Sequence, residues 1–234
     1  MHMKKAKRPG PERLHQQVAR TIGSAILAGV HAPGASLVGE VEQSAAMGVS
    51  RTAYREAMKI LAAKGLIESR PKAGTHVTPR SRWALLDPDV LAWTFTGEPD
   101  PAYVRDLFEL RGVIEPAAAA LAAERRSEAQ VEAMRAALSV MGAKGLATEE
   151  GRQADNDFHR LLLEATGNAV VVSLAGSVGA AVQWTTHFKQ QKQSKPRDPL
   201  SEHLVLCEAI ADGDPVGAHA AMNELLRLAL EDMA

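Results

Sequence analysis

Three side chains in the second half of the sequence have the types and spacing of metal ligands. Asp155 and His159 stand four residues apart in a stretch with helical periodicity, so both leave the same face of that helix. His203 shares an apolar stripe with Cys207 and Ile210 on a later helix. Carboxylates and imidazoles bind first-row divalent metals, and i, i+4 spacing lets two of them hold one ion. A histidine on an apolar face is more often a satisfied core residue, so both interpretations stay open from the residues alone.

An ion pair or an anion site is predicted on an earlier helix of the same half. Arg111 and Glu115 fall on the inward face of that helix, among apolar residues. A buried charge needs a partner. The two residues can pair with each other at i, i+4, or Arg111 can in addition bind the carboxylate of a ligand, which suits its planar fork of donors. These two alternatives stay open at this point.

The first half contains a short helix with marked ends and one basic face. Ser50 is a good N-cap, and Gly65 suits the left-handed position that ends a helix. Arg51, Arg55 and Lys59 lie at i, i+4 and i+8 without a carboxylate on their line. Like charges at this spacing repel, so they do not serve helix stability. A basic face backed by an apolar stripe is what a DNA recognition helix needs.

The residues after this helix predict a β-hairpin. Residues 66–70 and 75–78 have strand patterns, and 71–74 form the turn between them. A basic helix followed by a basic-tipped hairpin is typical of a winged helix-turn-helix. Six residues of the helix and the hairpin are predicted to contact base edges, phosphates or the minor groove: Arg51, Thr52, Arg55, Lys72, Gly74 and Thr75.

This region resembles the DNA-binding domain of GntR-type bacterial transcription regulators. The resemblance is carried by 49–52, 55–57, Leu61, 65–67, 74–75 and Val77. Residues 100–230 resemble the all-helical FCD effector domain of the FadR-like branch, through 109–111, 115–116, 155–159, 167–168, 202–203, 209–210, 214 and 221–222. Together the two resemblances cover most of the chain and imply a homodimeric regulator that binds double-stranded operator DNA and a small carboxylate effector.

The resemblance also implies a metal. In such domains an Asp and three His commonly hold a divalent cation at the base of a carboxylate-binding pocket. Asp155, His159 and His203 match the first three, but the expected fourth position is Leu225. Either one zinc-like ion binds weakly and is completed by water or effector oxygens, or the pocket is metal-free and the histidines bond the effector directly.

The segment that joins the two halves is rich in Trp and Leu. Trp83 and Trp93, with residues 86–91 between them, are predicted to be buried between the domains. The segment resembles that of regulators of sugar-acid catabolism, which implies an aldonate or uronate effector. Four residues are then predicted to bind it: Arg111, Gln183, Trp184 and His187. The last three have an alternative interpretation as helix surface or dimer contacts.

The charge distribution separates the two halves. Residues 1–82 hold 14 Lys and Arg against 5 Asp and Glu, whereas residues 83–234 hold 13 against 23. A basic module joined to an acidic one indicates nucleic-acid binding by the first. The single Cys207 excludes an intrachain disulfide, and no apolar run could span a bilayer or serve as a signal peptide. We therefore predict a cytoplasmic protein with no membrane partner.

The predicted fold is mainly α, with an N-terminal winged helix-turn-helix and a C-terminal all-α bundle of six to seven helices. The predicted parts are a flexible basic arm (1–12), the DNA-binding domain (13–79), a linker (80–99) and the effector-binding and dimerisation domain (100–234). Two rival functions remain: a metal-dependent hydrolase built on the Asp155 cluster, and an architectural DNA binder whose affinity depends almost only on salt. No positioned general base or nucleophile supports the first.

Overall fold

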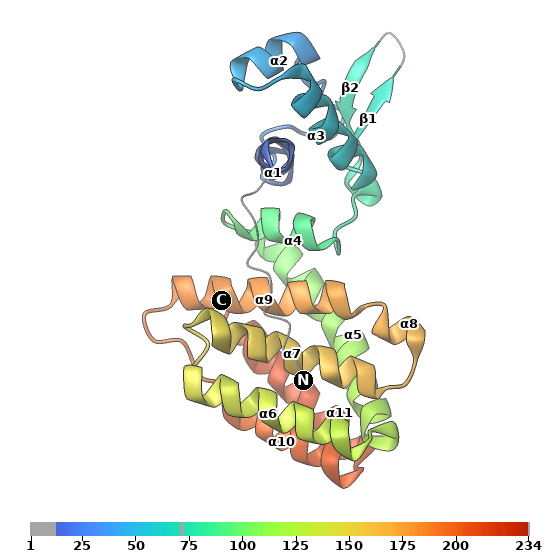
Figure 1. Cartoon of the computed structure of the whole chain (residues 1–234), viewed down its shortest axis with the longest axis vertical. Helices are drawn as coiled ribbons and strands as arrows, with labels where there is room; N and C mark the ends of the chain where they lie inside the picture. The colour runs from blue at the N-terminus through green and yellow to red at the C-terminus, as the bar shows by residue number, and fades with distance from the viewer. Residues whose placement is uncertain (1–12, 71–72, 234) are drawn as a thin grey trace, which may run out of the picture. The chain divides into compact units, whose positions relative to one another are not determined.

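The computed structural model describes residues 13–70 and 73–233, and Figure 1 shows the course of the chain. The chain divides into two units, one ending at Gly97 and the other beginning at Glu98. The first contains a helix-turn-helix with a two-stranded wing, and the second is a helical bundle, so the predicted fold class is confirmed. The predicted arm at residues 1–12 lies outside the described residues. No helix in the described part of the chain has both the length and the apolar character needed to cross a membrane.

The first unit holds four α-helices in its described part, a 3₁₀ turn and a hairpin. In chain order these are α1 (Leu14–Leu27), α2 (Glu40–Ala46), α3 (Arg51–Ala63), β1 (Ile67–Arg70), β2 (Gly74–Val77), η1 (Arg80–Arg82) and α4 (Pro88–Phe95). The strands are antiparallel, with Ile67 opposite Val77. A bridge from Ser36 to His76 adds the segment before α2 to the free edge of β2.

The ends of α3 are set by the two residues that the sequence indicated. The Ser50 hydroxyl accepts a hydrogen bond from the Ala53 amide at 3.1 Å. Gly65 has φ +72°, and a Cβ there would lie 2.1 Å from the carbonyl oxygen of Arg82. Only glycine fits both the backbone angle and the close approach. The helix buries Tyr54, Ala57 and Leu61, which leaves its basic face exposed.

Trp83 and Trp93 are buried, but in the core of the first unit, so the prediction of burial between domains was wrong. The Trp83 indole donates to the carbonyl of Thr78 at 3.1 Å. Trp93 lies against Gly23 of α1, where an added Cβ would come within 2.4 Å of the ring. Because α4 completes this core, residues 80–97 belong to the first unit and are not a separate linker. A hydrophobic pattern predicts burial, but it does not tell which core will take it.

The second unit contains seven α-helices within its described residues, 98–233. They are α5 (Pro101–Arg125), α6 (Glu128–Lys144), α7 (Glu149–Ala165), α8 (Ala169–Val172), α9 (Ala175–Lys192), α10 (Leu200–Asp212) and α11 (Pro215–Glu231). The main packing partners are α5 with α11, α6 with α7, α7 with α9, and α10 with α11 (Figure 1). The core between them is apolar and includes Phe158, Leu206 and Met222.

Several helices in this unit begin at a residue whose side chain caps the first turn. Asp100, Ser127, Thr148 and Asp214 each accept a hydrogen bond from a first-turn amide. The helical stretch that follows Asn168 is divided into two helices, α8 and α9, that meet at Ser173 and Leu174. The three valines in α8 are stiff at χ1, and the Ser173 hydroxyl bonds the Val170 carbonyl at 2.7 Å, which together favour a break.

Candidate functional site

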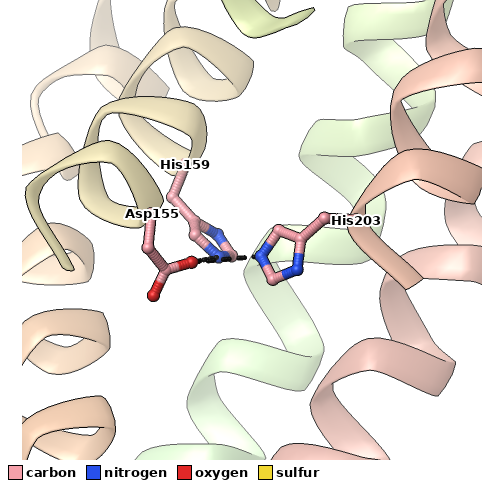
Figure 2. Close-up of side chains that lie close together, drawn as sticks. All are labelled: Asp155, His159 and His203. Carbon is pink, nitrogen blue, oxygen red and sulfur yellow. Dashed lines mark ion pairs between the residues drawn. The ribbon is translucent and has the colours of Figure 1, made fainter. Parts of the chain in front are cut away.

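The three predicted metal ligands meet in the interior of the helical unit. Asp155 and His159 project from α7 toward His203 on α10 (Figure 2). Asp155 Oδ1 lies 3.1 Å from His203 Nε2 and 3.8 Å from His159 Nε2. One ligand atom from each residue lies within 4.8 Å of the other two, and all three side chains are buried. The i, i+4 spacing on α7 and the apolar stripe of α10 therefore bring the cluster together as predicted.

Both histidines are held through Nδ1, which leaves Nε2 turned toward Asp155. His203 Nδ1 lies 2.8 Å from the carbonyl oxygen of Pro199, the residue before α10. His159 Nδ1 lies 2.9 Å from Glu115 Oε2. A histidine that ligates a metal usually donates its other ring N–H to a carboxylate or a carbonyl, which fixes the tautomer and the ring. The arrangement therefore has the supporting contacts of a metal site as well as its ligands.

Buried polar atoms without hydrogen bonds give a test of this fit. Asp155 Oδ1 and His203 Nε2 are buried and make no hydrogen bond with the described residues, and the same holds for His159 Nδ1, whose contact with Glu115 is short but poorly angled. Such atoms are costly unless something binds them. A divalent cation held by Asp155, His159 and His203 would satisfy the first two. The residues present fit a metal with three protein ligands and open positions.

The position expected for a fourth ligand faces the same cavity. Leu225 on α11 is buried and lines the cavity beside Asp155 and His203. Leucine offers no ligand atom, so the cluster holds three candidate ligands from the part of the chain that the structure describes. Any further position on an ion must be filled by water or by a ligand, which is one of the two outcomes left open by the sequence.

Arg111 and Glu115 form the predicted buried pair and also border the cluster. Arg111 Nε lies 2.6 Å from Glu115 Oε1, and both side chains are at most 5% exposed. Burial alone would raise the pKa of Glu115, but the charges of Arg111 and His159, together with the hydrogen bonds from Arg111, outweigh it and hold that pKa at about 2. Burial also opposes ionisation of Asp155, yet His203, His159 and Arg111 keep its pKa below the usual value. Both carboxylates are therefore ionised at neutral pH.

The cluster and Arg111 line one cavity of about 40 Å³. From α9 the cavity receives Val182, Thr185, Thr186 and Lys189. Gln183, Trp184 and His187 are half-buried and do not line it. The sequence pattern identified the correct helix, but α9 has no clear apolar stripe, so the pattern could not fix which of its residues face inward. Of the four predicted effector-binding residues, the structure brings only Arg111 to the cluster.

Two further cations reach this cavity, and sequence reasoning missed both. Lys189 is 6% exposed, and Arg197 comes from the polar loop between α9 and α10. Thr186 adds a hydroxyl that lies 3.3 Å from Asp155 Oδ2. The pattern of α9 does not predict the burial of Lys189, because its hydrogen-bond partners lie outside that helix: the Arg197 carbonyl in the following loop and the Asp232 carboxylate at the end of α11.

The predicted DNA-contacting residues of α3 lie on its exposed face. Arg51, Thr52 and Arg55 are all exposed. Arg51 Nε bonds Glu40 Oε1 at 2.9 Å, and Arg55 lies 3.9 Å from the same carboxylate. The basic line therefore has carboxylate partners, contrary to the expectation: Glu40 of α2 for the two arginines, and Glu56 of α3 for Lys59, at 2.7 Å. The i, i+4 pattern could not show a partner from another helix. Exposed pairs of this kind contribute about 0–1 kcal/mol, so phosphates can compete for these arginines.

The wing presents Gly74 and Thr75 at the turn end of the hairpin. Gly74 is exposed with φ +86°, and Thr75 is half-buried. Lys72, the predicted basic tip, lies outside the described residues. The exposed start of α3 and the wing belong to the same unit, as a winged helix-turn-helix requires.

Comparison with known proteins finds a separate family match for each half of the chain. Residues 14–77 match the model of the bacterial regulatory proteins of the gntR family, and residues 106–228 match that of the FCD domain. The chain is 32% identical over 202 residues to the galactonate operon transcriptional repressor of Escherichia coli K12, and the aligned region spans 85% of this chain and 88% of that protein. It is also 32% identical over 218 residues to the regulator YieP of the same strain, covering 92% and 94%.

The chain belongs to the GntR family. It is a GntR regulator with an FCD domain, hence a DNA-binding transcription regulator and not an enzyme. A solved structure of Lar, which controls the expression of the Listeria monocytogenes agr system, has the same fold, with a TM-score of 0.64 at 18% identity over 96% of this chain and 98% of that one. The hydrolase and the architectural DNA binder are thereby set aside.

Proposed function

We propose that this GntR regulator represses a catabolic operon as a homodimer and leaves its operator when a sugar acid binds in the helical domain. The observation that carries the proposal is the cavity in which Asp155, His159 and His203 meet Arg111. A guanidinium beside an open metal position suits a carboxylate with adjacent hydroxyls. The likeness to a galactonate operon repressor supports an aldonate, with galactonate as the first candidate.

The DNA-binding half of the proposal assigns contacts to Arg51, Thr52 and Arg55 on α3. The wing, with Lys72, Gly74 and Thr75, would follow the backbone or the minor groove. Two copies of the helix would read two half-sites of a palindromic operator. Effector binding would change the distance and orientation between the two winged helices of the dimer. The spacing of the operator half-sites would then fit the effector-free state better than the effector-bound state. Sedimentation of the purified protein tests the dimer directly.

The effector and metal halves are tested by thermal unfolding of the purified protein with a panel of aldonates and uronates. A ligand that binds the native state raises the midpoint by mass action. Each acid is measured with and without a chelator, and galactitol serves as the matched polyol without a carboxylate. A shift with galactonate that the chelator abolishes supports both effector and metal. A shift that survives the chelator means a metal-free pocket, and no shift with any acid rejects the sugar-acid assignment.

A further inference from the structure

The end of α11 carries a carboxylate that two cations hold beside the cavity. Asp232 Oδ2 lies 3.0 Å from Lys189 Nζ and 3.1 Å from Arg197 Nε. The Gln193 amide donates to the Asp232 carbonyl oxygen at 2.6 Å. Asp232 is the C-cap of α11, where the helix dipole disfavours negative charge. The contacts from α9 and the following loop therefore offset an unfavourable position, and the buried Lys189 in turn needs an anion.

The same two cations line the cavity of the Asp155 cluster. Arg197 donates through Nε to Asp232 and through Nη1 to Glu202, but its Nη2 is buried and has no hydrogen-bond partner among the described residues. A guanidinium with one unused donor, next to a buried ammonium, is a binding position for a planar carboxylate. Arg111 serves the cluster from α5, and Lys189 with Arg197 form a second cationic position on the same cavity.

The cavity as it stands is too small for a sugar acid. At about 40 Å³ it has room for one or two water molecules, whereas ligand pockets usually measure about 300–1,000 Å³. A second cavity of about 940 Å³ is lined by residues of α5, α9 and α11 and by the segments that flank them. The two cavities share Lys189 and Met233, and Asp232 lines the larger one. Movement of the Asp232–Met233 end of α11 would join them.

We propose that Lys189 and Arg197 form a carboxylate-binding position that Asp232 of the chain itself occupies here, and that the effector carboxylate takes over when it enters the cavity. Asp232 then acts as an internal substitute for the ligand. Its release frees the end of α11, opens the small cavity to the large one and lets the hydroxyls of the effector reach the Asp155 cluster. The inference rests on the proposed function for the identity of the effector, a monocarboxylate with several hydroxyls.

Chemical rescue with formate tests the binding position without any assumption about the effector. Asp232→Ala removes the internal carboxylate and leaves space for a small one. We expect 100 mM sodium formate to raise the unfolding midpoint of this full-length variant by about 3 °C more than 100 mM sodium chloride does. Formate should raise the unfolding midpoint of the wild type no more than sodium chloride does, because Asp232 fills the position. Equal midpoints of Asp232→Ala in the two salts would overturn the proposal.

Two control variants make the rescue specific. Asp232→Asn removes the charge but keeps the side-chain volume, so formate finds no space and should not rescue it. Glu224→Ala removes an exposed carboxylate of the same helix that forms an ion pair with Arg227. Because this change opens no space between Lys189 and Arg197, the variant should respond alike to both salts. Rescue of either control as large as that of Asp232→Ala would show a general effect of formate and count against the position.

A second measurement covers the case in which Asp232→Ala does not fold. Arg197→Gln leaves the internal pair of Lys189 and Asp232 in place, and calorimetric titration should show about tenfold weaker galactonate binding than wild type. Unchanged affinity would overturn the role of Arg197. If galactonate does not bind wild type, that result counts against the sugar-acid assignment alone, and the formate rescue decides the present proposal.

Discussion

Glu115 contacts both Arg111, the candidate anion-binding residue of the helical domain, and His159, one of its candidate metal ligands. Its carboxylate accepts hydrogen bonds from Arg111 at both oxygens, and Oε2 also lies 2.9 Å from His159 Nδ1. It therefore orients a guanidinium that suits an anion and an imidazole that suits a cation. The sequence indicated the pair at i, i+4, but it could not show that the same carboxylate supports a histidine from α7.

Restoring the absent fourth ligand tests whether Leu225 faces the cluster. Leu225→His places an imidazole where the cavity is lined by leucine, and we expect zinc to bind at least about tenfold more tightly. Competition with a chromophoric chelator measures the affinity. Leu225→Gln, which adds polarity without a good ligand, is the matched control. Equal zinc affinity in wild type and Leu225→His would place the metal elsewhere or reject it.

Glu40 competes with DNA for the basic face of α3. Glu40→Gln removes the partner of Arg51 and one negative charge beside the phosphates, so we expect about two- to fivefold tighter DNA binding at low salt. Glu42→Gln makes the same charge change on α2 at an exposed site. Fluorescence anisotropy compares the two variants. If both raise the affinity equally, the effect is one of net charge and not of freed arginines.

Cys207 should be unreactive in the folded protein. Burial, with a smaller effect of Glu208, raises the pKa of its thiol to about 11, so little thiolate exists at pH 8. We expect a disulfide reagent to label one thiol only after unfolding. The unfolding free energy should fall between pH 9 and 11, because the unfolded thiol ionises first. Rapid stoichiometric labelling of the native protein at pH 8 would contradict this.

At the scale of elements, helix boundaries could be predicted and inward faces only in part. Ser50, Asp100 and Asp214 mark helix starts because capping is a local interaction between neighbours in the chain. The inward residues of α9 could not be identified, because that helix has polar residues on every side. Arg197 and Asp232 were missed for a related reason: their contact joins a loop to a helix end 35 residues later.

The contact of α1 with α4 depends on one small residue. Gly23→Ala would bring a methyl group within 2.4 Å of the Trp93 ring, and we expect a loss of about 1–3 kcal/mol in the stability of the DNA-binding unit. Gly112→Ala, a helical glycine with open space around it, should be neutral or slightly stabilising. Urea unfolding followed by fluorescence measures both. An unchanged midpoint for Gly23→Ala would contradict a close contact between Gly23 and the Trp93 ring.

At the scale of the whole molecule, the charge asymmetry indicated correctly which half binds DNA. The basic half carries the winged helix-turn-helix and the acidic half carries the FCD domain. The boundary was misplaced because the Trp-rich segment reads as a linker in the sequence but completes the first core. How effector binding in the helical unit changes DNA binding by the first unit must be measured on the intact regulator.

That measurement is operator affinity with and without the effector. An operator is first selected from random DNA by the purified protein, and its binding is then followed by fluorescence anisotropy at fixed salt. We predict that saturating galactonate weakens binding at least about tenfold, that galactitol does not, and that Arg111→Gln abolishes the response while leaving binding in the absence of galactonate intact. Operator affinity that stays unchanged in saturating sugar acids would contradict the account.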